Sequence, residues 1–259
     1  MAPSWMLSSY SAHTLEGYVG HGLSQAELDY VFGSSRSYEL TRSSHSQTKT
    51  QFPDASSALV FSDYNSLVAA LNAHMPAGVK AVMYDPENWS FTPAAQQQNP
   101  AHYEQLAAEV AHAHGLELIA APAVNLATES GGGQSTSKYD QYIANSYAAA
   151  AAKYADVYEI QAQGLEGNTA EYSQFLAKAI AQAKAANPDI TIFAGLSTSA
   201  DGSAVTSQQL FQDVKATDNE VAGYWLNIAG PSPYSPNVHE SNPGVAVGLL
   251  NDLWLAART

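Results

Sequence analysis

Residues 79–89 read Val-Lys-Ala-Val-Met-Tyr-Asp-Pro-Glu-Asn-Trp, and this stretch decides the fold prediction. Its first half is an apolar, β-prone run of the kind found in buried strands. Its second half presents Asp85 and Glu87, with a proline between them, and then Trp89. Proteins with alternating strands and helices usually place their chemistry at the carboxyl ends of the strands. The stretch therefore predicts a buried strand that delivers two carboxyl groups to a functional edge.

After this stretch, short apolar runs alternate regularly with helical segments. The predicted strands of this part are 79–85, 116–121, 157–163, 190–196 and 221–227. The predicted helices are 100–114, with Asn99 as N-cap and Gly115 as the stop, then 138–154, 170–186, 206–216 and 245–257. Strands separated by roughly 30–40 residues with one helix between them indicate parallel βαβ units.

The first third of the chain must supply the remaining strands. Candidate strands are 5–10, 38–41 and 58–61, and candidate helices are 25–32 and 64–74, the second capped by Asp63. The polar stretch 43–57 shows no helix. Eight strands in 259 residues fit an α/β fold with a single (β/α)8 TIM barrel over residues 1–259. An open doubly wound sheet is the alternative.

Composition excludes several functional classes. The net charge is −14, which argues against nucleic acid and anionic membranes as partners, since both require basic patches. No apolar run approaches the roughly 18 residues of a membrane span. The absence of cysteine excludes disulfides, thiolate metal sites and cysteine nucleophiles.

Composition also bears on location. Lysine plus arginine is only 10, and small polar residues are abundant, which favours a secreted protein from a high-GC bacterium. The first residues lack the pattern of a signal peptide, so a cytoplasmic location stays open. Nothing in the sequence specifies the oligomeric state.

The strand 157–163 predicts a polar interior at one end of the barrel. Side chains alternate along a strand, and the apolar set Tyr158, Ile160 and Ala162 should face the helices. The other set, with the same alternation applied to the neighbouring strands, should face inward. Its members are Asp85, Glu87, Asn125, Glu159, Gln161, Gln163, Trp225 and Asn227. Burying unpaired polar groups costs about 1–3 kcal/mol each, so this set indicates a polar cleft.

Structural explanations compete with this interpretation. A single carboxylate at a strand end is often a helix cap or a loop anchor, and Asp85 could bond the turn amides after Pro86. Glu159 could pair with one of the few basic residues. Two histidines, His112 and His114, diverge on a helix and cannot chelate one metal. The chain has no nucleophile elbow, phosphate-binding loop or dinucleotide fingerprint, so neither a metal nor a cofactor is expected.

At Asp85-Pro86-Glu87 the chain resembles the family-18 glycoside hydrolases, which include chitinases and endo-β-N-acetylglucosaminidases. The resemblance implies that Glu87 is the general acid and that Asp85 orients an N-acetyl group, which acts as the nucleophile. It also implies that Trp225 lines the floor of the sugar subsite.

The chain departs from the family at several positions. Ala81 and Met83 stand where the family has two more aspartates, and 161–163 lacks the tyrosine and aspartate of the sixth strand. The chain is also similar to spherulin-4-like polysaccharide hydrolases through Tyr84-Asp85 and Glu159. Substrate-assisted chemistry and a two-carboxylate mechanism therefore both stay open, and the incomplete family-18 motif and the inward-facing Glu159 slightly favour the second.

We expect a secreted glycoside hydrolase that acts on a polysaccharide or oligosaccharide. Glu87 would donate the proton, Asp85 would orient substrate and keep Glu87 protonated, and Glu159 would be the second carboxylate of an alternative scheme. The residues expected to bind the sugar are Asn125, Gln161, Gln163, Trp225, Asn227, Trp89 and Tyr84. The alternatives are a catalytically silent carbohydrate-binding barrel, or a barrel enzyme acting on a small non-sugar metabolite.

Overall fold

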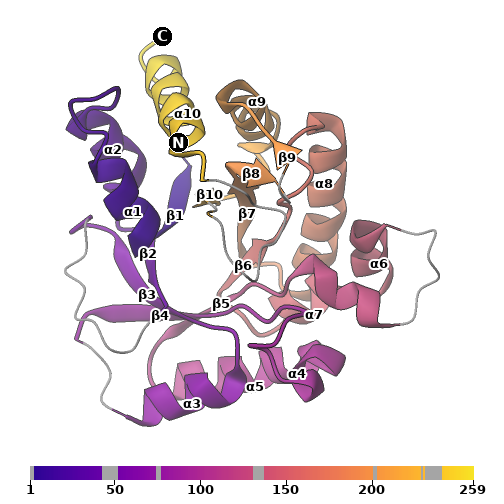
Figure 1. The fold of residues 1–259 in the computed structure, drawn as a ribbon. Helices are drawn as coiled ribbons and strands as arrows, with labels where there is room; N and C mark the ends of the chain where they lie inside the picture. Colours follow the sequence, from indigo (N-terminus) through magenta and orange to yellow (C-terminus); the bar gives the residue numbers. More distant parts are fainter. Residues whose placement is uncertain are drawn as a thin grey trace.

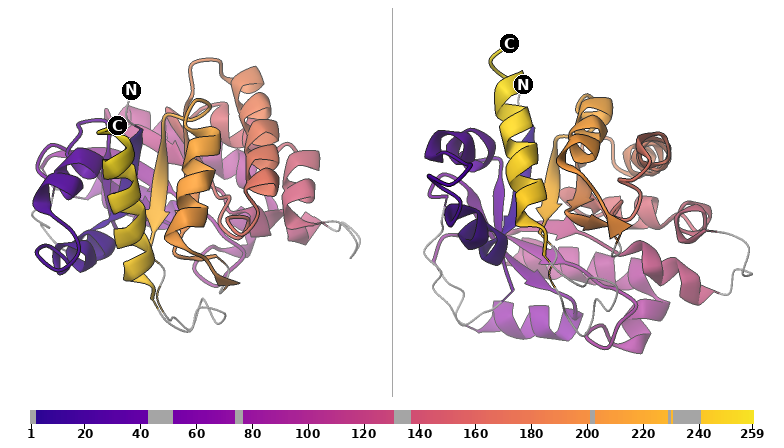
Figure 2. Two further views of the ribbon diagram at one scale, coloured as in Figure 1. Left: turned by 90° about the horizontal axis from the view of Figure 1, so that it is seen from above. Right: turned by 45° about the horizontal axis from the view of Figure 1, so that its top comes forward.

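The computed structural model describes residues 3–42, 52–73, 77–130, 137–200, 203–228, 230 and 241–259. Within these ranges eight parallel strands close into a barrel, and helices surround it (Figures 1 and 2). The barrel strands are β1 Ser4–Ser8, β2 Tyr38–Thr41, β3 Ser56–Phe61, β4 Val79–Tyr84, β5 Glu117–Ala120, β6 Val157–Ile160, β7 Thr191–Ser197 and β10 Gly223–Asn227. Their order around the barrel follows the chain, so the fold is a (β/α)8 TIM barrel and the open sheet is excluded.

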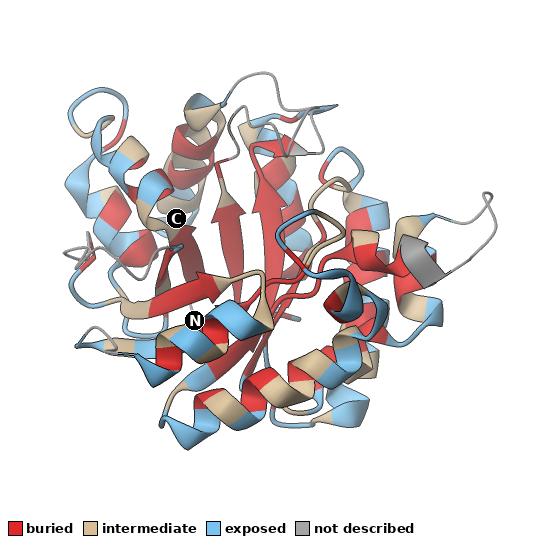
Figure 3. Cartoon of the chain, turned by 60° about the horizontal axis from the view of Figure 1, so that its bottom comes forward, coloured by how far each residue is buried: buried red, intermediate tan, exposed pale blue. Residues whose placement is uncertain are grey.

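The helices form the outer layer, and each turns one side toward the strands (Figure 3). They are α1 Ser9–Glu16, α2 Gln25–Phe32, α3 Tyr64–Asn72, α4 Ala94–Gln98, α5 Pro100–Ala113, α6 Lys138–Ala144, α7 Tyr147–Ala152, α8 Thr169–Ala186, α9 Ser207–Thr217 and α10 Pro243–Ala256. A 3-10 helix, η1 Val124–Ser130, follows β5, and a small hairpin of β8 Ser199–Ala200 and β9 Ser203–Ala204 follows β7. No helix of the described ranges is long and apolar enough to cross a membrane.

Local sequence signals account for several helix ends. Asp63 caps α3 as expected, because its carboxylate accepts the amides of Asn65 and Ser66 at 3.1 Å each. Gly115 follows α5 with a φ of 70°, a left-handed conformation that favours glycine. Asn99 is the N-cap of α5 and Pro100 follows it in the first turn, as expected, but the Asn99 side chain makes no capping hydrogen bond.

Several expected element bounds differ from the observed ones. The expected helix 138–154 is two helices, because Ser146 adopts a left-handed φ of 58° and so interrupts the helix between α6 and α7. Strand β1 ends at Ser8, whose hydroxyl caps α1, so Tyr10 is helical. Strand β6 ends at Ile160. The expectation of no helix in 43–57 lies outside the described residues for 43–51, and residues 56–57 belong to β3.

The core has two parts. The larger cluster fills the space between strands and helices, and it contains Tyr84, Tyr158 and Ile160. The smaller cluster fills the barrel interior with residues from all eight strands. Its members are Met6, Leu40, Ala58, Val60, Ala81, Met83, Ile119, Ala121, Val157, Phe193 and Trp225. Interior and exterior residues alternate along the strands, which confirms the expected register of β4, β6 and β10.

Candidate active site

Three neighbouring strands bring two carboxyl groups into one row inside the barrel. In β4, β5 and β6 the residues that pair side by side are Tyr84, Ala120 and Tyr158. The next residues along the chain are Asp85, Ala121 and Glu159, and they face inward because their predecessors face the helices. Ala121 is the residue between the two acids in this row, and the charge of Asp85 acts on Glu159, so the pair shares one region at the carboxyl ends of the strands.

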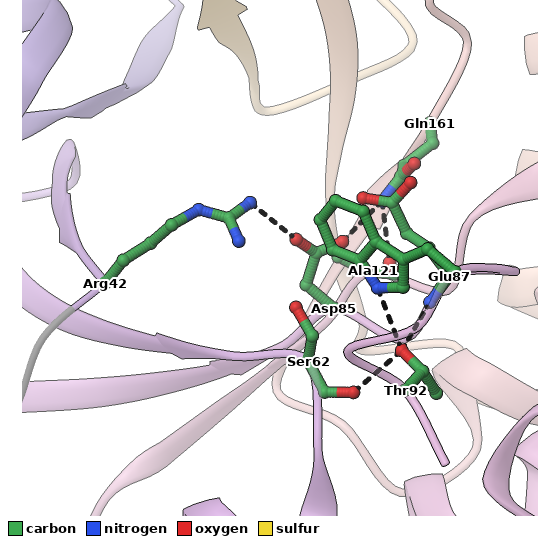
Figure 4. A network of polar contacts seen from close by, with 8 residues as sticks. Arg42, Ser62, Asp85, Glu87, Thr92, Ala121 and Gln161 are labelled. Atoms are coloured by element: carbon green, nitrogen blue, oxygen red, sulfur yellow. Dashed lines mark hydrogen bonds and ion pairs between the residues drawn. The ribbon is translucent and has the colours of Figure 1, made fainter. Parts of the chain in front are cut away.

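Asp85 is fully buried and is bound from two sides (Figure 4). Arg42 donates to its Oδ2 at 3.3 Å, and Gln161 Nε2 donates to its Oδ1 at 2.8 Å. Burial raises the pKa of Asp85 to about 6, while Arg42 and Gln161 act in the opposite direction. Asp85 is therefore a carboxylate at neutral pH despite its enclosure.

Glu159 lies in the same row without such support. Its side chain is fully buried, and within the described part of the chain neither carboxyl oxygen has a hydrogen-bond partner. Burial, reinforced by the negative charges of Asp85 and Glu87, raises the pKa of Glu159 well above its ordinary value. Burial and the neighbouring charges thus favour the protonated form of Glu159. The alternative of an ion pair with a basic residue is not formed within the described ranges.

Glu87 lies on the loop that follows β4, and it is partly exposed, unlike the two acids beneath it. Thr92 organises this loop: its hydroxyl accepts from the Glu87 amide at 3.0 Å and donates to the Ser62 carbonyl at 2.9 Å (Figure 4). The Asn88 amide donates to Asn125 Oδ1 at 2.9 Å, which ties the loop to η1. These bonds fix the backbone that carries Glu87.

An aromatic wall stands beside these acids. Trp89 Nε1 donates to Thr92 Oγ1 at 3.0 Å, and the indole packs edge to face with the exposed Phe91 at 5.3 Å. The Arg42 guanidinium carbon lies 5.7 Å from the centre of the Trp89 ring. Arg42 therefore contacts both the buried carboxylate and the aromatic wall.

The two glutamines after β6 lie above the row of acids. Gln161 Nε2 also donates to the Ala121 carbonyl at 2.9 Å, so its amide bridges Asp85 and the residue that follows β5. The side chain of Gln163 lies where a Cβ on Gly195 would stand, so this glycine makes room for it. Both glutamines are partly exposed, and they present polar groups at the barrel mouth above Glu159.

Glu166 holds the loop after β6 against β7. Its carboxyl oxygens accept from the amides of Gly164 at 2.6 Å and Ser197 at 2.7 Å. Burial raises its pKa to about 7, and these backbone bonds act in the opposite direction. Sequence reasoning missed Glu166, because nothing in the local pattern shows that it faces the end of β7.

The last strand contributes Trp225 and Asn227 on its inward face. Trp225 belongs to the interior cluster, is 9% exposed, and its Nε1 has no hydrogen-bond partner among the described residues. Asn227 is partly exposed at the end of β10, and its backbone carbonyl accepts from the Thr198 amide at 3.0 Å. Both residues therefore occupy the inward-facing positions of the last strand that the sequence alternation predicts.

Two expected sugar-binding residues need correction. Tyr84 is fully buried in the helix-facing core, where its hydroxyl donates to Gln96 Oε1 at 2.8 Å, so it does not reach the mouth. Asn125 does not extend a strand past Ala121, because β5 ends at Ala120 and Asn125 lies in η1. Its side-chain oxygen supports the Asn88 amide instead.

Arg42 is the main site residue that sequence reasoning missed. It follows β2 at the alternate position after Leu40, which is part of the interior cluster, so the inward-facing pattern was available.

Among the residues that the structure describes, no group of three His, Asp or Glu side chains is arranged so that it could hold a metal ion.

Comparisons with known proteins support the fold. No protein-family model matches the chain, and no curated protein matches it. Triosephosphate isomerase from Bartonella henselae is 10% identical with a TM-score of 0.52, over 98% of this chain and 100% of that chain. A family-17 β-1,3-glucanosyltransferase from Rhizomucor miehei is 12% identical, with a TM-score of 0.49 over 86% of this chain and 88% of that chain.

A family-18 chitinase from Pseudoalteromonas aurantia is 14% identical, with a TM-score of 0.39 over 69% of each chain. The solved structures that this chain resembles therefore include glycoside hydrolases built on a TIM barrel. At these identities the likeness concerns the fold alone.

Proposed function

We propose that this protein hydrolyses glycosidic bonds, with Glu87 as the group that protonates the departing oxygen. One observation carries the proposal: Glu87 is the partly exposed member of a set of three acids at one barrel mouth, beside Trp89, whereas Asp85 and Glu159 are fully buried. Glycosidases use carboxyl groups to donate a proton and to stabilise the positive charge that develops on the sugar ring. An aromatic side chain beside the acids offers an apolar face on which a sugar ring can pack.

Asp85 would supply the negative charge beneath the reacting sugar. It is held as a carboxylate in an enclosed position, where a fixed charge acts more strongly than it does in water. Its two oxygens are already bonded to Arg42 and Gln161, so we assign it an electrostatic role and no direct hold on an N-acetyl group.

Glu159 would influence the charge of Asp85 and would not be the nucleophile. Sequence reasoning slightly favours it as the second catalytic carboxylate. Its full enclosure and raised pKa now favour an indirect role, because a neutral, buried acid neither touches the sugar nor attacks it. A neutral Glu159 also lets Asp85 keep its charge, since two adjacent carboxylates repel each other.

The sugar would rest on the partly exposed side chains at the mouth. Trp89 offers an aromatic face, and Gln161, Gln163 and Asn227 offer amide donors and acceptors for hydroxyl groups. Trp225 would line the floor of this site from the interior cluster, where its indole N–H is buried without a partner among the described residues. A secreted location, expected from composition, suits a polysaccharide substrate.

The test is turnover of a panel of polysaccharides by the wild-type protein and by Glu87→Gln. The substitution removes the transferable proton and preserves the shape of the side chain. The proposal requires release of reducing ends by the wild type, loss of that release in the variant, and retained binding of the same carbohydrate.

A second candidate is carbohydrate binding without cleavage. One observation favours it: Asp85 and Glu159 are fully enclosed, which leaves Glu87 as the exposed acid of the three. This candidate predicts that wild-type protein binds a member of the panel without releasing reducing ends, and that Glu87→Gln binds equally well.

A further inference from the structure

Arg42 reaches Asp85 across an intervening strand. It follows β2, Asp85 follows β4, and β3 lies between them. The axes of β2 and β4 are about 10 Å apart, twice the spacing of neighbouring strands. The register of β3 and β4 places the small Ser62 beside Asp85, which leaves the path open to the long arginine (Figure 4). The Arg42 side chain is thus long enough to reach Asp85, and Ser62 is small enough not to block it.

A matching contact comes from the other side. Gln161, after β6, reaches Asp85 across β5, where the intervening residue is Ala121. The two contacts differ in charge. Gln161 can bond either form of a carboxyl group, whereas the Arg42 guanidinium favours the ionised form. Arg42 is therefore the partner that selects the carboxylate at Asp85.

The surroundings of Asp85 make this selection necessary. Among the residues that the structure describes, the charged or titratable groups near it are Arg42 after β2, Glu87 from its own loop (Figure 4), Glu159 from β6 and Glu104 from α5. Three of these four are acids, and Asp85 itself is fully buried. Without the guanidinium, burial and like charges would all favour a protonated Asp85.

The same guanidinium also contacts the loop of the proposed proton donor. It lies over Trp89, which is two residues after Glu87 and is anchored to Thr92 as Glu87 is. The Arg42 side chain is 58% exposed, so it lies at the mouth and is not a core residue. One side chain thus links the end of β2, the buried carboxylate and the aromatic wall.

We propose that Arg42 is a positioning residue that holds Asp85 as a carboxylate and seats the indole of Trp89 beside Glu87. The inference rests on the proposed function for its role in hydrolysis. The two contacts themselves can be tested without any substrate.

The experiment is a carbon-13 NMR titration of aspartate carboxyl groups in the full chain, with the Asp85 signal assigned through Asp85→Asn. In Arg42→Gln we expect the titration midpoint of Asp85 to rise by about 1 pH unit or more, because a neighbouring cation lowers it by that amount. Arg42→Lys should restore most of the difference. The indole N–H signal of Trp89, assigned through Trp89→Phe, should move in Arg42→Gln.

The matched control is Arg36→Gln. Arg36 precedes β2 as Arg42 follows it, so it lies at the opposite end of the barrel, and it is exposed. This variant should leave both signals unchanged. An Asp85 midpoint that is the same in Arg42→Gln and in the wild type overturns the inference.

Turnover separates this inference from the proposed function. If Arg42→Gln moves the Asp85 midpoint but the wild type cuts no carbohydrate, the Arg42–Asp85 relationship stands and the hydrolase proposal fails. If Glu87→Gln abolishes turnover while Arg42→Gln leaves the midpoint unmoved, the hydrolase proposal stands and the role of Arg42 is refuted.

Discussion

Asp85 and Glu159 lie in one row of the barrel interior, on either side of Ala121, and their surroundings differ in how strongly they favour the protonated form. The difference follows from their partners. Asp85 has a guanidinium and an amide as donors, whereas Glu159 has no hydrogen-bond partner among the described residues. Two acids in one enclosed space cannot both be charged without a large penalty. The barrel therefore keeps its charge at Asp85, directly below the loop that carries Glu87.

This arrangement predicts how activity depends on pH. The pKa of Asp85 is about 6, so the fraction of charged Asp85 rises as the pH increases through this value. We expect kcat to rise with pH on the acid side of the profile, with a midpoint near 6, because the carboxylate stabilises charge on the sugar. A profile of kcat against pH between 5 and 7 checks this. A flat profile in this window would exclude the charge of Asp85 from the rate.

The role of Glu159 is tested by Glu159→Gln. The substitution retains the size of the side chain and mimics its neutral form, so we expect turnover within about tenfold of the wild type. A direct catalytic carboxylate would instead lose about 10²–10⁴-fold, as general acid–base groups do. Single-substrate kinetics on purified protein separate the two results, and a loss as large as that in Glu87→Gln would show that Glu159 takes a direct part.

The sugar-binding role of the aromatic wall is tested by Trp89→Ala. Loss of one aromatic face should weaken oligosaccharide binding by about tenfold, since such contacts contribute roughly 0.5–1.5 kcal/mol beyond the buried area. Calorimetric titration measures the change. The control is Trp254→Ala, because Trp254 lies on α10, where it packs against Tyr30. Equal weakening in both variants would assign the effect to stability and not to the site.

Glu104 provides a prediction about stability. It is buried on α5 without a hydrogen-bond partner among the described residues, and burial raises its pKa well above the ordinary value. The folded chain therefore binds this proton more tightly than the unfolded chain. The free energy of unfolding should consequently fall as the pH rises above the unfolded value, until the folded pKa is passed.

In Glu104→Gln this fall should be smaller, because the amide does not titrate. The variant should therefore gain stability relative to the wild type between pH 5 and pH 8, because only the wild type has a raised pKa whose contribution is lost as the pH rises. Urea unfolding at the two pH values measures the difference. A gain that is independent of pH would show that Glu104 is not the titrating group.

Much of the fold was predictable from the sequence, because strand periodicity is a local property. The run that ends at Asp85 and the alternation around Glu159 specify both the barrel and its inward-facing acids. The strand 38–41 was found despite its four residues, and the structure gives it the same bounds. The same alternation argues against Tyr84 as a site residue, because it precedes the inward-facing Asp85 and must point the other way.

The remaining features depend on contacts between distant segments. Arg42 and Asp85 are 43 residues apart, and only closure of the barrel brings them together. The role of Thr92 in organising the loop of Glu87 is likewise a matter of loop geometry. The break at Ser146 has only the pair Asn145-Ser146 as a sequence signal, within an alanine-rich stretch that otherwise favours helix.

The central claim is tested most directly by comparing the wild-type protein with Glu87→Gln on the polysaccharide panel, with reducing ends as the readout. We expect the wild type to cut at least one member and Glu87→Gln to lose about 10²–10⁴-fold in rate while keeping its fold and its affinity for that carbohydrate. Glu109→Gln, an exposed change on α5, should retain full activity. Turnover by Glu87→Gln at the rate of the wild type would contradict the assignment of Glu87 as the proton donor.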